Sequence, residues 1–162
     1  MWVSRLYPAW QPLTCLTSNG LSTMAFSLPG ALAARLAFPQ RKVLAVMGDG
    51  SFMMNSQEIE TAVREQIPLV VLVWVDGSYG LIKWKMDMEE GAHDSVDFGN
   101  PDFVKYAQSF GARGCLIAEA AQLLPALNRA LAEDGVTVIA CPVDYRENMA
   151  LVSKLGELTI AL

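Results

Sequence analysis

Short runs of apolar residues recur along the chain, bounded by charged residues, proline or glycine. Runs of this length that are rich in β-branched side chains predict strands buried on both faces of a parallel sheet. The clearest is Leu69–Val75, in which every residue is apolar. The strands predicted in this way are Thr14–Thr17, Lys42–Met47, Leu69–Val75, Gly114–Ile117 and Val136–Cys141.

Between these runs, apolar residues recur every three or four positions, which is the spacing of one face of a helix. In Ser56–Gln66, for example, Ile59, Ala62 and Val63 share a face, and the segment ends just before Pro68. The segments predicted to be helical are Met24–Phe38, with its middle disturbed by Pro29 and Gly30, then Ser56–Gln66, Asp102–Phe110 and Ala121–Glu133.

Two segments show no such period. Asp76–Asn100 contains four glycines and is predicted to be long and irregular. Pro142–Leu162 is a tail to which the pattern assigns no structure.

Strands that alternate with helices predict an α/β fold, in which helices flank a mainly parallel sheet. A length of 162 residues suits a single domain, residues 1–162. A sheet covered on both faces, a large partner interface, or both would account for the high apolar content of 52%. In such sheets, ligands bind beyond the carboxyl ends of the strands.

Composition excludes two classes of partner. The apolar runs Val43–Met47 and Leu69–Val75 are far shorter than the roughly 20 residues that cross a bilayer, so no membrane partner is expected. The net charge is −5, without a cluster of lysine or arginine, so nucleic acid is not expected to bind either.

The cysteines and the histidine indicate no metal or disulfide framework. Cys15, Cys115 and Cys141 are far apart, which predicts buried thiols in a reducing compartment. His93 has no second histidine at ligand spacing. No signal-peptide pattern opens the sequence, so a cytoplasmic location is expected.

The strongest chemical signal is Gly48–Ser51, which reads Gly-Asp-Gly-Ser and follows the first clear strand. Glycines let the backbone turn sharply and approach a ligand closely. Amides at the start of the next helix can receive phosphate oxygens, and Asp49 offers a hard oxygen suited to Mg²⁺. By itself the same motif is also a good β-turn.

A second glycine-rich turn makes a metal site the better interpretation. Leu69–Val75 is followed at once by Asp76–Gly80, which reads Asp-Gly-Ser-Tyr-Gly. The interval of 25 residues, 51 to 75, holds one helix and one returning strand, so Asp49 and Asp76 should emerge at the same edge of the sheet. Two carboxylates and two glycine-rich turns there predict a site for Mg²⁺ and a diphosphate.

This spacing resembles the fingerprint of thiamine-diphosphate enzymes. Longer segments resemble the large subunits of acetolactate synthases, chiefly their C-terminal third, and nearest to the catabolic, acetolactate-forming branch. These segments are Ser18–Met24, Leu28–Ala31, Asn55–Val63, Val96–Phe103 and Pro142–Tyr145. The resemblance covers nearly the whole chain and implies the thiamine-diphosphate-binding fold.

The resemblance also implies roles for individual residues. Asp49 and Asp76 would bind Mg²⁺ through their carboxylates, and Ser78 would bind it through its backbone carbonyl. Many relatives have Asn-Asn or Asn-Asp where this chain has Val75 and Asp76. The second position, that of the metal ligand, is therefore retained, and Asp in place of Asn adds a negative charge there. The residues implied to contact the diphosphate are Gly48, Gly50, Ser51, Tyr79 and Gly80.

Two further residues would contact the rest of the cofactor. The carbonyl of Ser22 would accept a hydrogen bond from the 4′-amino group of the pyrimidine ring. Met24 matches the bulky residue that holds the cofactor in a bent shape. Without the resemblance, Met24 would be interpreted as a methionine in the core of a helix.

In the complete enzyme, the resemblance implies the decarboxylative condensation of two pyruvates, or other 2-keto acids, to 2-acetolactate. The cofactors would be thiamine diphosphate and Mg²⁺, and a need for FAD stays open. The glutamate that activates the cofactor lies in an N-terminal domain of that family, so no catalytic residue is expected in this chain. The cofactor of the family lies between domains of two subunits, which implies a homo-oligomer or a partner chain.

Alternatives stay open at this point. Met1 and Trp2 match an internal Met-Trp pair of the family, so the chain reads as an internal start, a split gene or a fragment. It would then be a non-catalytic or split subunit that acts only with a partner. Another thiamine-dependent 2-keto-acid decarboxylase or carboligase is a rival within the same class. A dinucleotide-binding domain is disfavoured, because no Gly-x-Gly-x-x-Gly follows a strand.

Overall fold

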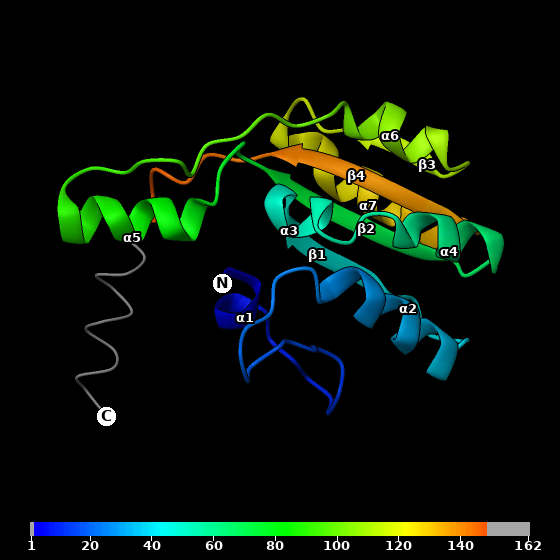
Figure 1. The fold of residues 1–162 in the computed structure, drawn as a ribbon. Helices are drawn as coiled ribbons and strands as arrows, with labels where there is room; N and C mark the ends of the chain where they lie inside the picture. The colour runs from blue at the N-terminus through cyan, green and yellow to red at the C-terminus, as the bar shows by residue number, and fades with distance from the viewer. Residues whose placement is uncertain (1, 149–162) are drawn as a thin grey trace.

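A four-stranded parallel sheet forms the centre of the protein (Figure 1). The computed structural model describes residues 2–148. The strands lie in the order β1-β2-β4-β3, and each neighbouring pair is parallel. The predicted α/β class, with helices flanking a parallel sheet, is therefore confirmed.

The elements follow one another along the chain with short connections, except near the N-terminus and between α5 and α6. In chain order they are α1 (Trp2–Leu6), α2 (Ser27–Ala37), β1 (Leu44–Gly48), α3 (Asp49–Met53), α4 (Glu58–Arg64), β2 (Leu69–Val75), α5 (Gly80–Glu90), α6 (Phe103–Ser109), β3 (Arg113–Leu116), the 3₁₀ turn η1 (Ala120–Gln122), α7 (Leu123–Ala132) and β4 (Val136–Pro142).

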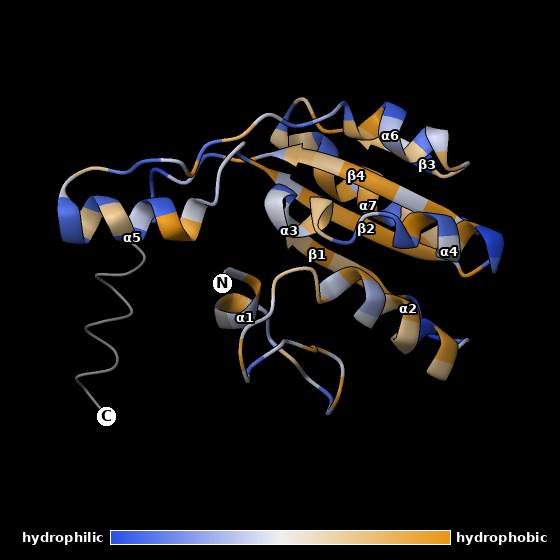
Figure 2. Cartoon of the chain, viewed as in Figure 1, coloured by the Kyte–Doolittle hydropathy of each residue, from blue (hydrophilic) through white to orange (hydrophobic). Residues whose placement is uncertain are grey.

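Both faces of the sheet are buried, as the continuous apolar strands predict. Alternate residues of β2 point to opposite faces: Val71 packs with α2, α4 and α6, whereas Leu72 packs with α7. Figure 1 shows α3 and α4 on one side of the sheet and α7 on the other. Figure 2 shows the strands as the most hydrophobic part of the fold.

Helix α5 stands apart from this core. It extends away from the carboxyl end of the sheet (Figure 1), and every one of its residues is partly or fully exposed. The sequence prediction of an irregular segment over Asp76–Asn100 is wrong for this stretch. Its glycines lie at the ends of the helix: Gly80 opens it, and Gly91 closes it in the left-handed conformation with φ 73°.

Other predicted boundaries also need correction. Thr14–Thr17 forms bends and irregular backbone instead of a strand. The helix predicted at Met24–Phe38 begins only at Ser27, so Pro29 lies in its first turn, where a missing N–H costs nothing, and does not disturb its middle. Helix α1 was not predicted, and the tail Pro142–Leu162 lies outside the described residues from position 149 onward.

Two further observations bear on the sequence predictions. Cys141 is buried, but Cys15 and Cys115 are only half-buried, so the prediction of three buried thiols is correct for one. Within residues 2–148, none of the helices has the length and apolar character that a membrane crossing requires.

Candidate functional site

The two predicted turns meet at the carboxyl edge of the sheet. Strands β1 and β2 are parallel neighbours, with Gly48 paired to Trp74. Asp49 therefore begins α3 beside the point where β2 ends and Asp76 begins the next turn. Asp49 is buried, with 1% of its surface exposed. The structure thus brings the two carboxylates to one edge, as the spacing predicted.

The Asp49 carboxylate is held by N–H donors from three segments. Its Oδ2 accepts from the amide of Asp76 over 3.1 Å, from the amide of Gly77 over 2.8 Å and from Nδ2 of Asn100 over 2.6 Å. Its Oδ1 accepts from the amide of Gly50 over 2.8 Å. These bonds fix the orientation of the buried carboxylate.

Asp76 lies in a different electrostatic environment. Burial raises the pKa of Asp76 above its ordinary value, and the nearby charge of Asp49 acts in the same direction. The hydroxyl of Ser78 donates to Oδ2 of Asp76 over 3.0 Å, and this bond offsets part of the rise in the pKa of Asp76. Two carboxylates forced together in this way favour a cation between them.

Gly80 is required by the position of the Asp76 carboxylate. A Cβ atom added at Gly80 would lie 2.6 Å from Oδ2 of Asp76, which is closer than real Cβ contacts come. The second glycine of the turn therefore leaves room for the carboxylate to sit over the start of α5.

Two aromatic rings cover the first turn of α3. The rings of Tyr79 and Phe98 lie 4.9 Å apart, and a Cβ atom at Gly50 would approach the Tyr79 ring to 2.9 Å. The amide of Tyr79 donates to the carbonyl of Val96 over 2.9 Å. The amides of Gly50 and Tyr79 thus have acceptors within the chain, whereas those of Ser51 and Gly80 lie in first turns, where no intrahelical acceptor exists.

The N-terminal segment reaches the site through one hydrogen bond. The amide of Ala25 donates to Oγ of Ser51 over 2.8 Å. Met24, the preceding residue, lies before α2 and is 38% exposed, so its interpretation as a helix-core methionine is wrong. Ser22 is exposed as well and has a positive φ of 51°. The segment implied to hold the cofactor rings therefore lies open beside α3.

Two residues at this edge were given no role from the sequence. Asn100 contacts Asp49 directly, although the motif around it was noted only as a resemblance. Tyr145 follows β4, and burial, together with the charges of Asp76 and Asp49, raises its pKa to about 12. A signal for Tyr145 was available in the expectation that strand ends and their following loops converge, but Asn100 lies in the loop after α5 and had no such signal.

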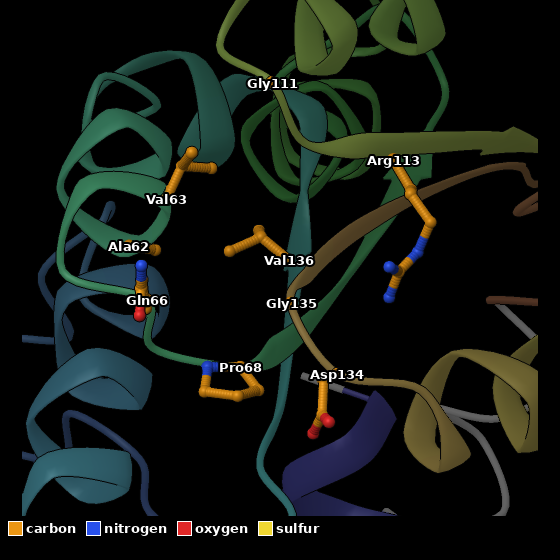
Figure 3. Close-up of a pocket in the computed structure, with 9 residues that line it drawn as sticks. All are labelled: Ala62, Val63, Gln66, Pro68, Gly111, Arg113, Asp134, Gly135 and Val136. Carbon is orange, nitrogen blue, oxygen red and sulfur yellow. The ribbon is translucent and has the colours of Figure 1, made fainter.

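One hollow of the described surface lies away from this edge. A cavity of about 350 Å³ is lined by residues at the opposite end of the sheet, among them Pro68, Arg113 and Gly135, which precede or begin β2, β3 and β4 (Figure 3). Ligands of parallel α/β sheets bind at the carboxyl ends, where the paired carboxylates lie and this cavity does not.

The residues at the edge fit a magnesium ion that is shared with a phosphate ligand. The described residues contain no group of three histidine, cysteine or acidic side chains that could hold a metal. Asp49 and Asp76 supply two carboxylates, and Ser78 is buried next to them. Mg²⁺ in proteins is commonly bound by one or two carboxylates together with phosphate oxygens and water.

Comparison with known proteins identifies the family of the chain. The family of thiamine pyrophosphate enzymes, represented by their C-terminal TPP binding domain, matches residues 1–141. The chain belongs to this family. Thiamine pyrophosphate is another name for thiamine diphosphate, so the resemblance inferred from the sequence is confirmed.

Relatives of this TPP-binding domain include acetolactate synthases. The Bacillus subtilis (strain 168) acetolactate synthase is 40% identical over 153 residues, which cover 94% of this chain and 27% of that protein. The catabolic acetolactate synthase of Raoultella terrigena is 39% identical over 155 residues, with coverage of 96% and 28%. The TPP-binding domain described here therefore spans little more than a quarter of the length of these relatives.

A solved structure supports the fold assignment. The thiamine diphosphate-dependent 4-hydroxybenzoylformate decarboxylase of Rhodococcus jostii RHA1 is similar to this TPP-binding domain with a TM-score of 0.71 and 32% sequence identity. The similarity covers 76% of this chain and 24% of that one.

Proposed function

We propose that this chain binds thiamine diphosphate together with Mg²⁺ at the carboxyl edge of β1 and β2. Asp49 and Asp76 would hold the cation through their carboxylates, and Ser78 through its backbone carbonyl. The observation that carries the proposal is the approach of the Asp76 turn to Asp49, with amide-to-carboxylate distances of 3.1 and 2.8 Å. The two carboxylates need a counter-charge, and Mg²⁺ provides one.

The backbone around these carboxylates would receive the diphosphate. The amides of Ser51 and Gly80 lie in first helical turns, and the turn at Gly48 lets the chain pass close to the ligand. The amides of Gly50 and Tyr79 would join them by exchanging their present acceptors, Asp49 and Val96. This exchange is a local change, because both donors already lie at the site.

The ring end of the cofactor would lie against the N-terminal segment. Ser22 would accept from the 4′-amino group through its carbonyl, and Met24 would hold the cofactor bent. The hydrogen bond from Ala25 to Ser51 supports this placement, because it ties the segment to the first turn of α3. When bound, thiamine diphosphate supplies the nucleophilic carbon for breaking and forming bonds next to a carbonyl.

In the complete enzyme we propose the acetolactate synthase reaction, in which two pyruvates lose one CO₂ and condense to 2-acetolactate. Residues 1–162 would form its C-terminal domain, and the glutamate that activates the cofactor would come from a part of the protein outside this chain. The relatives in Bacillus subtilis and Raoultella terrigena are acetolactate synthases at 40% and 39% identity, which favours this reaction over other carboligations.

Exposed apolar side chains support a partner at this end of the sheet. On α5, Leu81, Ile82 and Met88 are each at least half exposed. In the N-terminal segment, Trp10 is 88% exposed and Leu21 is 95% exposed. Apolar side chains clustered around a binding site mark surfaces that other domains or subunits cover. We therefore propose that further domains, or a second copy of the complete protein, close the site.

Calorimetric titration of the purified chain with thiamine diphosphate, in the presence and absence of Mg²⁺, tests the cofactor proposal. Asp76→Ala is the informative variant, because the backbone amides that hold Asp49 stay in place. Asp134→Ala is its matched control, since Asp134 is exposed at the opposite end of the sheet. We expect Mg²⁺-dependent binding that Asp76→Ala weakens at least tenfold and Asp134→Ala leaves unchanged. Binding that is indifferent to Mg²⁺ or to Asp76 would contradict the proposed site.

A further inference from the structure

Asn100 occupies an unusual position next to the proposed cation site. Its side-chain nitrogen Nδ2 lies 2.6 Å from Oδ2 of Asp49. Its side-chain oxygen Oδ1 is buried and has no hydrogen-bond donor among the described residues. One half of the amide is therefore engaged and the other half is not.

Chemistry fixes which way the amide points. Oδ2 of Asp49 already accepts from the amides of Asp76 and Gly77, so the atom of Asn100 that faces it is the donor nitrogen. Exchanging the two ends of the amide would place two acceptor oxygens 2.6 Å apart. The oxygen of Asn100 is consequently the end of the amide that does not contact Asp49, and it needs a donor or a cation.

The surrounding chain holds Asn100 in place from both sides. Before it, the amide of Phe98 donates to the carbonyl of Gly77 over 2.9 Å, and Asp97 forms a β-bridge with Ser78. After it, Asp102 caps α6 by accepting from the amides of Val104 and Lys105. The position is thus tied directly to the Asp76 turn, and the amide is preorganised instead of adapting to its surroundings.

A buried acceptor without a hydrogen-bond donor lowers the stability of the folded chain. Native proteins rarely keep such a group unless a ligand or water satisfies it. Asn100 touches a carboxylate that lies beside a second one, so the charge of this edge attracts cations. An amide oxygen is also a ligand type that suits a hard cation and its water shell.

We propose that Asn100 is a positioning residue of the cation site. Its Nδ2 orients the Asp49 carboxylate, and its Oδ1 faces the hydrated Mg²⁺ and satisfies part of the water shell of the ion. This inference rests on the proposed binding of Mg²⁺ with thiamine diphosphate. It adds a third segment, the loop before α6, to the two turns that the sequence motif assigns to the metal.

Mn²⁺ titration followed by electron paramagnetic resonance tests the inference without relying on enzyme activity. The signal of free Mn²⁺ gives the dissociation constant of the purified chain in the presence of thiamine diphosphate. Asn100→Leu keeps the approximate size and removes both polar atoms, whereas Asn100→Asp keeps an oxygen and adds a charge. Asn128→Leu is the matched control, because Asn128 is exposed on α7.

We expect Asn100→Leu to weaken Mn²⁺ binding about tenfold and Asn128→Leu to leave it unchanged. Asn100→Asp should bind Mn²⁺ within about threefold of the original chain, because its added charge offsets the lost donor. Without metal, Asn100→Asp should unfold at a lower temperature, and Mn²⁺ should raise that temperature by about as much as in the original chain, whereas the rise in Asn100→Leu should be smaller. This last readout distinguishes a residue facing the cation from one that only supports the loop.

Other outcomes overturn the inference. Unchanged affinity in Asn100→Leu would show that the side chain does not serve the cation. Equal losses in Asn100→Leu and Asn100→Asp would show that only the donor matters and that Oδ1 does not face the ion. If Asn100→Leu fails to fold, the affinity of Asn100→Asp for Mn²⁺ is compared with that of the original chain. A loss well beyond threefold would then overturn the inference. Failure of the original chain to bind Mn²⁺ at all would instead count against the proposed function.

Discussion

The backbone amide of Gly77 donates to Oδ2 of Asp49 over 2.8 Å, across 28 positions of sequence. This bond joins the turn after β2 to the turn after β1. It is one of four N–H donors that Asp49 accepts, and the residue is 1% exposed. Asp49 is therefore part of the fold as well as the proposed ligand of the cation.

Replacing Asp49 should destabilise the protein even without metal. Asp49→Ala leaves buried donors without an acceptor, so we expect the free energy of unfolding to fall by about 3 kcal/mol. Urea denaturation followed by circular dichroism measures this change. Asp134→Ala, at an exposed position, should shift the free energy of unfolding by less than about 0.5 kcal/mol. Equal stability of the two variants would contradict the hydrogen-bonding role of Asp49.

A methyl group at Gly80 should disturb the metal site more than the fold. The added Cβ would lie 2.6 Å from Oδ2 of Asp76 and would push the carboxylate away. We expect Gly80→Ala to weaken Mg²⁺-dependent cofactor binding about tenfold in calorimetric titration. Gly99→Ala is the matched control, because no atom lies within 4 Å of a Cβ there. Similar affinities in both variants would show that the Asp76 carboxylate is not needed in its present position.

Ala25 is strained in the segment that reaches α3. Its φ is 68°, a left-handed conformation that costs an alanine more than a glycine. We expect Ala25→Gly to raise the free energy of unfolding by about 0.5–1 kcal/mol, since its amide can still donate to Ser51. Ala31→Gly, inside α2, should lower it by about 1 kcal/mol or more. Thermal unfolding of both variants measures these opposite shifts, and a loss of stability in Ala25→Gly would contradict the argument.

The sequence predicted the meeting of Asp49 and Asp76 because a parallel sheet leaves little freedom. Once two consecutive strands are joined by a helix, their carboxyl ends fall at the same edge. The position of Asn100 could not be predicted in this way. It depends on how the loop after α5 packs, through the bridge of Ser78 to Asp97, and no sequence period encodes such a contact.

Helix α5 was missed for a related reason. A count of glycines predicted an irregular segment, but Gly80 and Gly91 mark the two ends of the helix, where glycine is favoured. Its surface pattern was also uninformative, because α5 does not bury one face against the sheet as α2 or α7 does. A helix with no fully buried residue gives only a weak amphipathic signal.

Tyr145 should make the stability of the protein fall at alkaline pH. Burial and the charges of Asp76 and Asp49 raise its pKa from 10.0 to about 12, so the folded chain holds the phenolic proton more tightly than the unfolded chain. The stabilisation is present below pH 10 and is lost as pH rises from about 10 to about 12. Because the ring is partly exposed, we expect the free energy of unfolding to fall by about 1 kcal/mol. This is less than half of the fall that the same pKa shift would give for a fully buried ring.

Urea denaturation at pH 9 and pH 11.5 measures this loss. Tyr145→Phe has no phenolic proton, so the difference in stability between the two pH values should be about 1 kcal/mol smaller than in the original chain. Comparing the two proteins at each pH removes the effect of lysine titration, which both share. An identical pH dependence would show that neither burial nor the nearby carboxylates raise the pKa of Tyr145 in the folded chain.

The isolated chain should form no acetolactate from pyruvate, even with thiamine diphosphate and Mg²⁺ bound. It spans 27% of the length of the Bacillus subtilis acetolactate synthase, and the proposed activating glutamate lies outside it. Product analysis by nuclear magnetic resonance with ¹³C-labelled pyruvate checks this.

A chimaera that joins the chain to the unmatched part of the Bacillus subtilis enzyme should restore turnover, and Asp76→Ala in that chimaera should abolish it. Turnover by the chain alone would show that its own residues activate the cofactor. An inactive chimaera that still binds the cofactor would instead show that the joined domains do not pack correctly. The exposed side chains of α5 would then not fit the surface of the Bacillus subtilis domains.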